Sequence, residues 1–300
     1  AMQQLLCSDV EVEPLPGTAK TGSVYVLFEW PDAWPRDVIG DAALGEELTS
    51  KLKPKLDEYN ATLLLIRHPT REGRNISDHH LYLVFADQAV TEVMHVDGPE
   101  ALLNLDLSGP GKNGGVERER PLLLICTHAK RDRCCAVKGR PLLNALHERY
   151  PFGPSNDVVW ETSHIKGHRF AATLLLMPWG YSFGRMNLEA TEAMIADAMR
   201  GQYFVPGNRG RGIFSPAAQT AEVGVAAQLA AEGTRITYGQ LQVVGEEVGE
   251  DEARIKLIDA STNATFDVTM RRSAVSGVIS SCGDEPKEGV VWGVEKIARS

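Results

Sequence analysis

The chain has 300 residues, of which 43% are apolar and 24% charged, and its formal net charge at pH 7 is -9. This composition excludes a disordered chain, a fibre and a disulfide-rich secreted module, and the acidic balance argues against a general nucleic-acid binder. No apolar run is long enough to cross a bilayer, and the N-terminus lacks the pattern of a secretory signal, so we expect a cytoplasmic protein without a membrane partner.

The first third of the chain has the pattern of an α/β region. A helical pattern covers 37–59 and contains Pro54, which we expect to kink or interrupt the helix. A short helix at 99–107 and a glycine-rich linker at 108–115 close this region. Continuous apolar runs predict strands at 23–30, 61–68 and 80–87.

The middle third predicts a small sheet with helices beside it. Its order is strand, helix, strand, strand, strand, helix, which is the thioredoxin-like arrangement. The two later strands are joined at Pro178-Trp179-Gly180, which is a hairpin signal. The elements are predicted at 121–128, 139–150, 156–163, 170–186 (two strands) and 188–201.

The last third begins with a well-marked helix. Ser215 is a good N-cap and Pro216 a good first helical residue, and the helix should run to about Gly233. The alternating segments that follow predict strands of an antiparallel sheet.

The chain has five cysteines, at positions 7, 126, 134, 135 and 282. An odd number without a secretory signal indicates a reducing compartment, where clustered cysteines are more often metal ligands or redox groups than disulfides. We assign no ligand role to Cys7 or Cys282.

Cysteines and histidines follow two strands that should be neighbours. Cys126 ends one predicted strand, and Cys135 lies at the far end of the polar loop after it. His164 and His168 come directly after another strand. The ends of these strands meet in a thioredoxin-like sheet, and Cys and His are ligand types for zinc and for iron–sulfur clusters. Alone, such a cysteine is usually a small buried apolar residue and such a histidine is usually solvated, so the prediction depends on their conjunction.

These residues resemble the sucrase/ferredoxin-like family, which contains a thioredoxin-like 2Fe–2S ferredoxin domain. The matching segments are CTHAKRDRCCAVKGRPL and VVWETSHIKGHRFAATLLLMPWGYSFGRM, with weaker matches at CSDVEVEPLPGTA, RGRGIFSPAAQTAE and SSCGDEP. The family pattern is a cysteine, eight residues, a second cysteine, and later His-x-Gly-x-His. Lys166 stands where the pattern has glycine.

The resemblance implies that Cys126, Cys135, His164 and His168 bind one 2Fe–2S cluster. Cys134 falls one residue short of the ligand position, which makes it a thiol beside the ligands. Other residues near the ligands are candidates to order the two loops or to donate a hydrogen bond, namely His128, Arg131, Arg133 and Arg169.

The predicted function is an electron carrier or redox sensor, and the sequence favours a non-catalytic carrier over an enzyme without deciding between them. Two neutral histidine ligands should raise the reduction potential and make it pH-dependent. An acidic carrier suits a redox partner, such as a reductase, with a basic docking face. The oligomeric state is open. The alternatives are a thioredoxin-like thiol–disulfide oxidoreductase, although no Cys-x-x-Cys is present, and a structural Cys₂His₂ zinc protein.

The expected organisation has three regions within an α/β fold. Residues 1–115 form an N-terminal α/β region, for which we consider a degenerate thioredoxin-like unit. Residues 116–203 form the thioredoxin-like ferredoxin domain. Residues 204–300 form a helix and β-strands packed on the rest.

Overall fold

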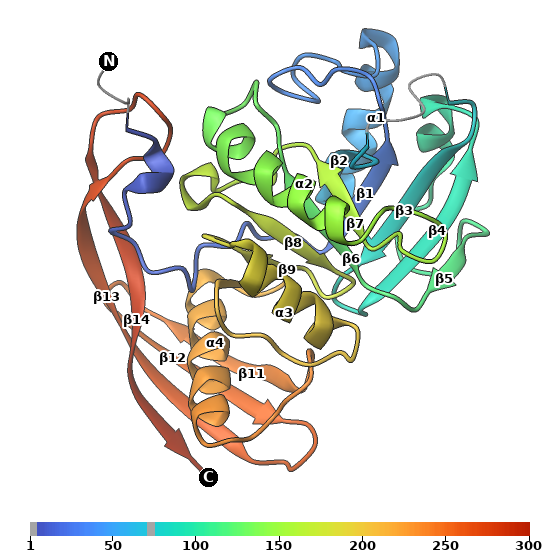
Figure 1. The fold of residues 1–300 in the computed structure, drawn as a ribbon. Helices are drawn as coiled ribbons and strands as arrows, with labels where there is room; N and C mark the ends of the chain where they lie inside the picture. The colour runs from blue at the N-terminus through green and yellow to red at the C-terminus, as the bar shows by residue number, and fades with distance from the viewer. Residues whose placement is uncertain (1–4, 71–75) are drawn as a thin grey trace. The chain divides into compact units, whose positions relative to one another are not determined.

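The computed structural model describes residues 5–70 and 76–300, which form two compact units (Figure 1). One consists of Gly22–Lys166 and Ala172–Gly180, and we call it the central unit. The other consists of the residues up to Thr21, Gly167–Ala171 and Tyr181–Ser300, and we call it the terminal unit. The three regions expected from the sequence divide the chain along its length rather than by contacts, and they stay predictions.

A mixed sheet forms the middle of the central unit, with strand order β8-β6-β7-β2-β1-β3-β4-β5. Every strand predicted in this part of the chain is present, and the sequence analysis missed β4 and the short β5. The strands are β1 (Val24–Glu29), β2 (Ala61–Arg67), β3 (His79–Phe85), β4 (Val90–Val96), β5 (Val116–Arg118), β6 (Leu122–Cys126), β7 (Val159–Thr162) and β8 (Leu174–Met177). The helical segments are α1 (Glu46–Glu58), α2 (Arg140–Arg149), the 3₁₀ turn η2 (Pro99–Asn104) and the π-helical segment η3 (Cys135–Gly139).

The central unit contains the same strand arrangement twice. In the N-terminal half, β1 leads through α1 to β2, which lies parallel to β1, while β3 lies antiparallel on the other side of β1. In the C-terminal half, β6 leads through α2 to a parallel β7, while β8 lies antiparallel on the other side of β6. The halves meet where β2 pairs antiparallel with β7, with Ile66 opposite Thr162. An approximate twofold relation at this junction therefore relates the two halves.

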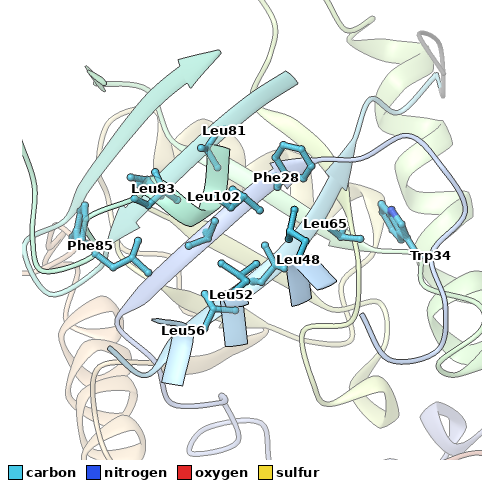
Figure 2. Close-up of a cluster of buried hydrophobic side chains, with 14 residues drawn as sticks. Phe28, Trp34, Leu48, Leu52, Leu56, Leu65, Leu81, Leu83, Phe85 and Leu102 are labelled. Carbon is cyan, nitrogen blue, oxygen red and sulfur yellow. The ribbon is translucent and has the colours of Figure 1, made fainter. Parts of the chain in front are cut away.

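The N-terminal half has its own apolar core (Figure 2). Leu48, Leu52 and Leu56 are spaced four residues apart, so they lie on one face of α1, and they pack against β1–β3 side chains such as Phe28 and Leu65. Full burial of each such side chain contributes about 1.5–3 kcal/mol. This packing fixes α1 on the sheet and explains why the helix continues through Pro54 without the expected interruption.

The helix expected over 37–59 begins only at Glu46. The preceding residues form turns instead, because the Asp37 carboxylate accepts hydrogen bonds from the backbone N–H groups of Ile39 and Gly40. Gly45, with a φ of 97°, then precedes the first helical residue. Side-chain-to-backbone bonding therefore replaces the first turns of the predicted helix.

The terminal unit contains a long helix on an antiparallel sheet. Helix α4 (Pro216–Ala231) starts as predicted, with the Ser215 hydroxyl accepting a hydrogen bond from the backbone N–H of Ala218. Its small apolar residues pack against the sheet, whose strand order is β11-β12-β13-β14. The remaining elements are the 3₁₀ turns η1 (Cys7–Asp9) and η4 (His168–Phe170), β9 (Tyr181–Phe183), α3 (Leu188–Ala198), β10 (Asn208–Arg211), β11 (Leu241–Val248), β12 (Glu252–Asp259), β13 (Thr265–Val278) and β14 (Lys287–Arg299).

The fold class predicted from the sequence is confirmed. The structure is mixed α/β, with a large sheet and, after it in the chain, a helix and an additional antiparallel sheet. Within the part of the chain that the structure describes, no helix combines the length and the apolar character needed to cross a membrane.

Candidate metal centre

Two parallel strands bring Cys126 and the loop of His164 to the same edge of the sheet. Cys126 is the last residue of β6 and lies opposite Thr162, the last residue of β7. His164 follows two residues later. Because parallel strands end at the same edge, the pairing of β6 with β7 places Cys126 and His164 near each other.

The loop after β6 folds back and returns a second cysteine to this edge. The backbone N–H of Cys135 donates to the Asp132 carbonyl, and the Asp132 carboxylate accepts a hydrogen bond of 2.9 Å from the N–H of Cys134. Cys135 then opens one π-helical segment, Cys135–Gly139, which continues into α2. Such π-turns are rare and are often found at functional sites.

The side chains of Cys126, Cys135 and His164 converge. One ligand atom from each, the two sulfurs and an imidazole nitrogen, lie within 4.8 Å of one another. Both cysteines are buried, at 1% exposure each, while His164 is half-buried. Two sulfurs and one imidazole nitrogen are a donor set that could hold a metal.

Hydrogen bonds favour a thiolate at Cys126. The Cys135 thiol donates to the Cys126 sulfur and lowers the pKa of Cys126, and this effect outweighs burial, which would raise it. The backbone N–H groups of His128 and Ile165 and the Thr173 hydroxyl donate to the same sulfur. The pKa of Cys135 is raised, first by its hydrogen bond to Cys126 and then by burial. These hydrogen-bond donors stabilise the negatively charged thiolate form of the buried Cys126 sulfur.

His128 connects the two loops. Its Nδ1 accepts a hydrogen bond of 3.1 Å from the backbone N–H of His164, so Nε2 carries the proton and donates to the Pro35 carbonyl at 2.7 Å. Burial lowers the pKa of His128, which keeps the imidazole neutral and Nδ1 available as an acceptor. The His128 side chain therefore holds the backbone of a candidate ligand, and its expected hydrogen bond to a bound group stays a prediction.

Glu161, the next-to-last residue of β7, links the strand ends near the site, and the sequence analysis missed it. Its side chain is fully buried and accepts hydrogen bonds from the guanidinium groups of Arg67 and Arg140 and, at 2.7 Å, from the Thr127 hydroxyl. Burial alone would raise the pKa of Glu161, but the hydrogen bonds and charges of Arg140 and Arg67 lower it overall. The available signal was an acidic residue inside the apolar strand VVWET.

The other residues expected near the ligands have diverse surroundings. Cys134 is fully buried in the ligand loop, and the Arg131 backbone N–H donates to the His128 carbonyl. Arg133 is half-buried in the same loop. In the terminal unit, Arg169 forms an ion pair with Glu13 at 2.6 Å. Their proposed roles toward a bound group stay predictions.

His168 lies in the terminal unit, whereas the other three predicted ligands lie in the central unit. Its Nε2 is 2.7 Å from the hydroxyl oxygen of Ser281. Its role as a fourth ligand stays a prediction.

The backbone at Lys166 explains the glycine of the family pattern. Lys166 has a φ of 66°, in the left-handed region that glycine adopts without strain. The lysine therefore keeps the loop conformation that a glycine would adopt at this position.

A family model described as sucrase/ferredoxin-like matches residues 15–212, about two thirds of the chain. The chain belongs to the sucrase/ferredoxin-like family. The match covers the converging cysteines and His164, and it also includes the whole N-terminal half of the central unit. No curated protein and no solved structure matches the chain.

Proposed function

We propose that this sucrase/ferredoxin-like protein is an electron carrier or redox sensor that holds one 2Fe–2S cluster through Cys126, Cys135, His164 and His168. The observation that carries the proposal is the convergence of two buried sulfurs and an imidazole within 4.8 Å. His168 is included because it completes the His-x-x-x-His spacing.

The donor set fits such a cluster. Thiolates and imidazoles are the protein ligands of Rieske-type 2Fe–2S centres. The Cys126 sulfur already accepts backbone N–H groups from His128 and Ile165, and hydrogen bonds to ligand sulfurs are one of the features that set a cluster's potential. When bound, the cluster supplies reversible one-electron chemistry.

The ligand charges support a raised potential. Two thiolates and two sulfides balance two ferric ions, whereas four thiolates would leave two negative charges. Adding an electron to a neutral centre is easier, so the potential is higher than with four cysteines. Each imidazole also keeps a second ring nitrogen that can hold a proton, and its proton affinity rises as the centre gains negative charge. Electron and proton uptake are therefore coupled.

The experiment is anaerobic reconstitution of the full chain, followed by iron and acid-labile sulfide analysis, visible absorption and electron paramagnetic resonance. The proposal expects iron and sulfide in equal amounts and a reduction potential that falls with rising pH. His164→Cys should lower the potential and flatten its dependence on pH. His147→Ala, on helix α2, is the control and should leave both unchanged. An unchanged spectrum in both the His164→Cys and the His168→Cys variants would overturn the ligand assignment.

The same preparation tests the alternatives. The hydrogen bond between the Cys126 and Cys135 thiols favours a thiol–disulfide oxidoreductase as the second candidate. A colourless protein that reduces a disulfide substrate only while Cys126 is present would support that candidate. A colourless protein with stoichiometric zinc would support a structural zinc site instead.

The proposed partner is a redox protein. A net charge of -9 complements a basic docking face on a reductase. Electron transfer to such a partner should slow as ionic strength rises, because screening weakens the attraction between the two surfaces.

A further inference from the structure

A second group of ligand-type side chains lies in the N-terminal half of the central unit. The Glu29 carboxylate at the end of β1 contacts two histidines. Its Oε2 is 2.9 Å from Nε2 of His68, and its Oε1 is 3.0 Å from Nδ1 of His80. These ligand atoms all lie within 4.8 Å of one another.

The twofold relation of the central unit places this group where the other half has its cysteine and histidine. Glu29 ends β1 opposite Ile66, and His68 follows Ile66 by two residues. Cys126 ends β6 opposite Thr162, and His164 follows Thr162 by two residues. The strand registers therefore make Glu29 equivalent to Cys126 and His68 equivalent to His164.

The third member obeys the same relation. His80 precedes Leu81, the partner of Phe28, by one residue. Thr173 precedes Leu174, the partner of Ile125, in the same way. His80 therefore occupies the place of Thr173, whose hydroxyl donates to the Cys126 sulfur. In the C-terminal half, the ends of the strands carry a cysteine and a histidine side by side. In the N-terminal half, the equivalent positions carry a glutamate and a histidine.

The group is charged and held in place. Burial alone would raise the pKa of Glu29, but hydrogen bonds from His68 and His80 lower it to about 2, so the carboxylate is ionised at neutral pH. The ring of His68 packs against Phe152, with centroids 4.2 Å apart, and against Trp160 at 4.8 Å. The Nδ1 of His79 also lies 2.7 Å from the Glu29 carbonyl oxygen.

The group is also accessible. The side chains of His68 and His80 are each 26% exposed, whereas that of Glu29 is 6% exposed. The imidazoles are therefore partly accessible to solvent, so water can supply the remaining ligands of an ion bound by these three side chains.

We propose that Glu29, His68 and His80 bind a divalent first-row transition-metal ion such as Zn²⁺, with water in the remaining coordination positions. Two imidazoles favour such an ion over Mg²⁺ or Ca²⁺, which prefer oxygen ligands. Three protein ligands of this type are the pattern of zinc and iron(II) sites that keep an open position. This site does not depend on the cluster proposed above.

The test is Co²⁺ titration of the metal-free, fully reduced full chain, followed by visible absorption. Cobalt on oxygen and nitrogen ligands gives weak ligand-field bands only, whereas cobalt on thiolates adds an intense near-ultraviolet charge-transfer band. The proposal expects one equivalent of cobalt without thiolate character, displaced by Zn²⁺. His68→Ala should weaken the binding of that equivalent at least about tenfold, and Glu29→Gln should do the same.

The controls separate the two sites. His147→Ala removes an imidazole elsewhere and should leave the titration unchanged. A cobalt spectrum with thiolate bands alone in the wild-type chain would overturn this proposal, while leaving the cluster proposal standing. Equal binding of the thiolate-free equivalent by the wild type, His68→Ala and Glu29→Gln would also overturn it. Because the first of these outcomes uses the wild type, the proposal stays falsifiable if a variant fails to fold.

Discussion

His128 accepts a hydrogen bond of 3.1 Å from the backbone N–H of His164, across two loops that leave neighbouring strands. The imidazole therefore positions the His164 backbone, while its other nitrogen is fixed by the Pro35 carbonyl. The next backbone N–H, that of Ile165, donates to the Cys126 sulfur. Two successive amides of the His164 loop are thus held by the loop that begins at Cys126.

Replacing His128 with alanine should loosen the His164 loop. The variant loses both hydrogen bonds of a largely buried ring, and each lost bond costs on the order of 1 kcal/mol. We expect a lower yield of reconstituted cluster and faster bleaching of its visible absorption. His147→Ala, which removes an imidazole from helix α2, should reconstitute like the wild type. Equal cluster lifetimes in the two variants would show that His128 does not position the loop.

Gly139→Ala should disrupt the ligand loop directly. A Cβ at this position would collide with the backbone carbonyl oxygen of Cys126, which has no flexible end that could move aside. We expect a loss of about 1–3 kcal/mol in the free energy of unfolding, measured by urea denaturation, together with a reduced metal content. Gly109→Ala is the matched control, because a Cβ there meets no atom within 4 Å. A Gly139→Ala variant as stable as this control would show that the contact can relax.

The sequence is sufficient to predict the strands at the site because their apolar runs are continuous and buried. The end of such a run also places Cys126 at the sheet edge. The family pattern adds the spacing to Cys135 and His164. Helix starts are less predictable. Side chains such as that of Asp37 compete with helical hydrogen bonding by accepting nearby backbone N–H groups, and the sequence does not show which bonding pattern is more stable.

Long-range contacts escape sequence reasoning for a different reason. The Glu29, His68 and His80 group depends on the registers of β1 with β2 and β3, and a one-residue slip in either would separate its members. Likewise, one of the partners that stabilise the buried Glu161 is Arg67, which lies 94 positions earlier in the chain. Composition and spacing carry no information about such pairs.

Glu222 should make the stability of the fold depend on pH. Burial raises the pKa of this carboxyl to about 7 from 4.5, even though hydrogen bonds from the Tyr181 and Tyr203 hydroxyls and the charge of Arg211 lower it. The folded state therefore binds a proton that the unfolded state releases between these two values. Wild-type stability should fall as pH rises through that window, by roughly 3 kcal/mol in total, and change no further from this group above pH about 7.

The measurement is the difference in free energy of unfolding between Glu222→Gln and the wild type from acidic to mildly alkaline pH. The amide carries no charge, so the free energy of unfolding of the variant should increase relative to that of the wild type as pH rises. Glu232→Gln, at the exposed end of the same helix, controls for the change in net charge. A constant difference across the range would mean that Glu222 does not titrate in this window.

Cys7 and Cys282 should form a disulfide under mild oxidation. They lie 275 positions apart, yet their sulfurs are 3.4 Å apart in the terminal unit, and the backbone N–H of Cys7 donates to the Cys282 sulfur at 3.3 Å. With oxidised glutathione, each thiol loses a proton, one sulfur–sulfur bond forms, and two electrons pass to the glutathione disulfide, which leaves as two thiols. Closing so long a loop should stabilise the chain by about 2–4 kcal/mol.

The measurement combines peptide mass mapping with thermal unfolding before and after oxidation. We expect one crosslink between the peptides of Cys7 and Cys282 and a higher melting temperature. Cys282→Ser should abolish both effects. Crosslinks that involve Cys126 or Cys135 would persist in this variant, which distinguishes them from the Cys7–Cys282 disulfide. If oxidation raises the melting temperature of Cys282→Ser as much as that of the wild type, the stabilisation comes from other thiols, and the close approach of these two sulfurs has no redox consequence.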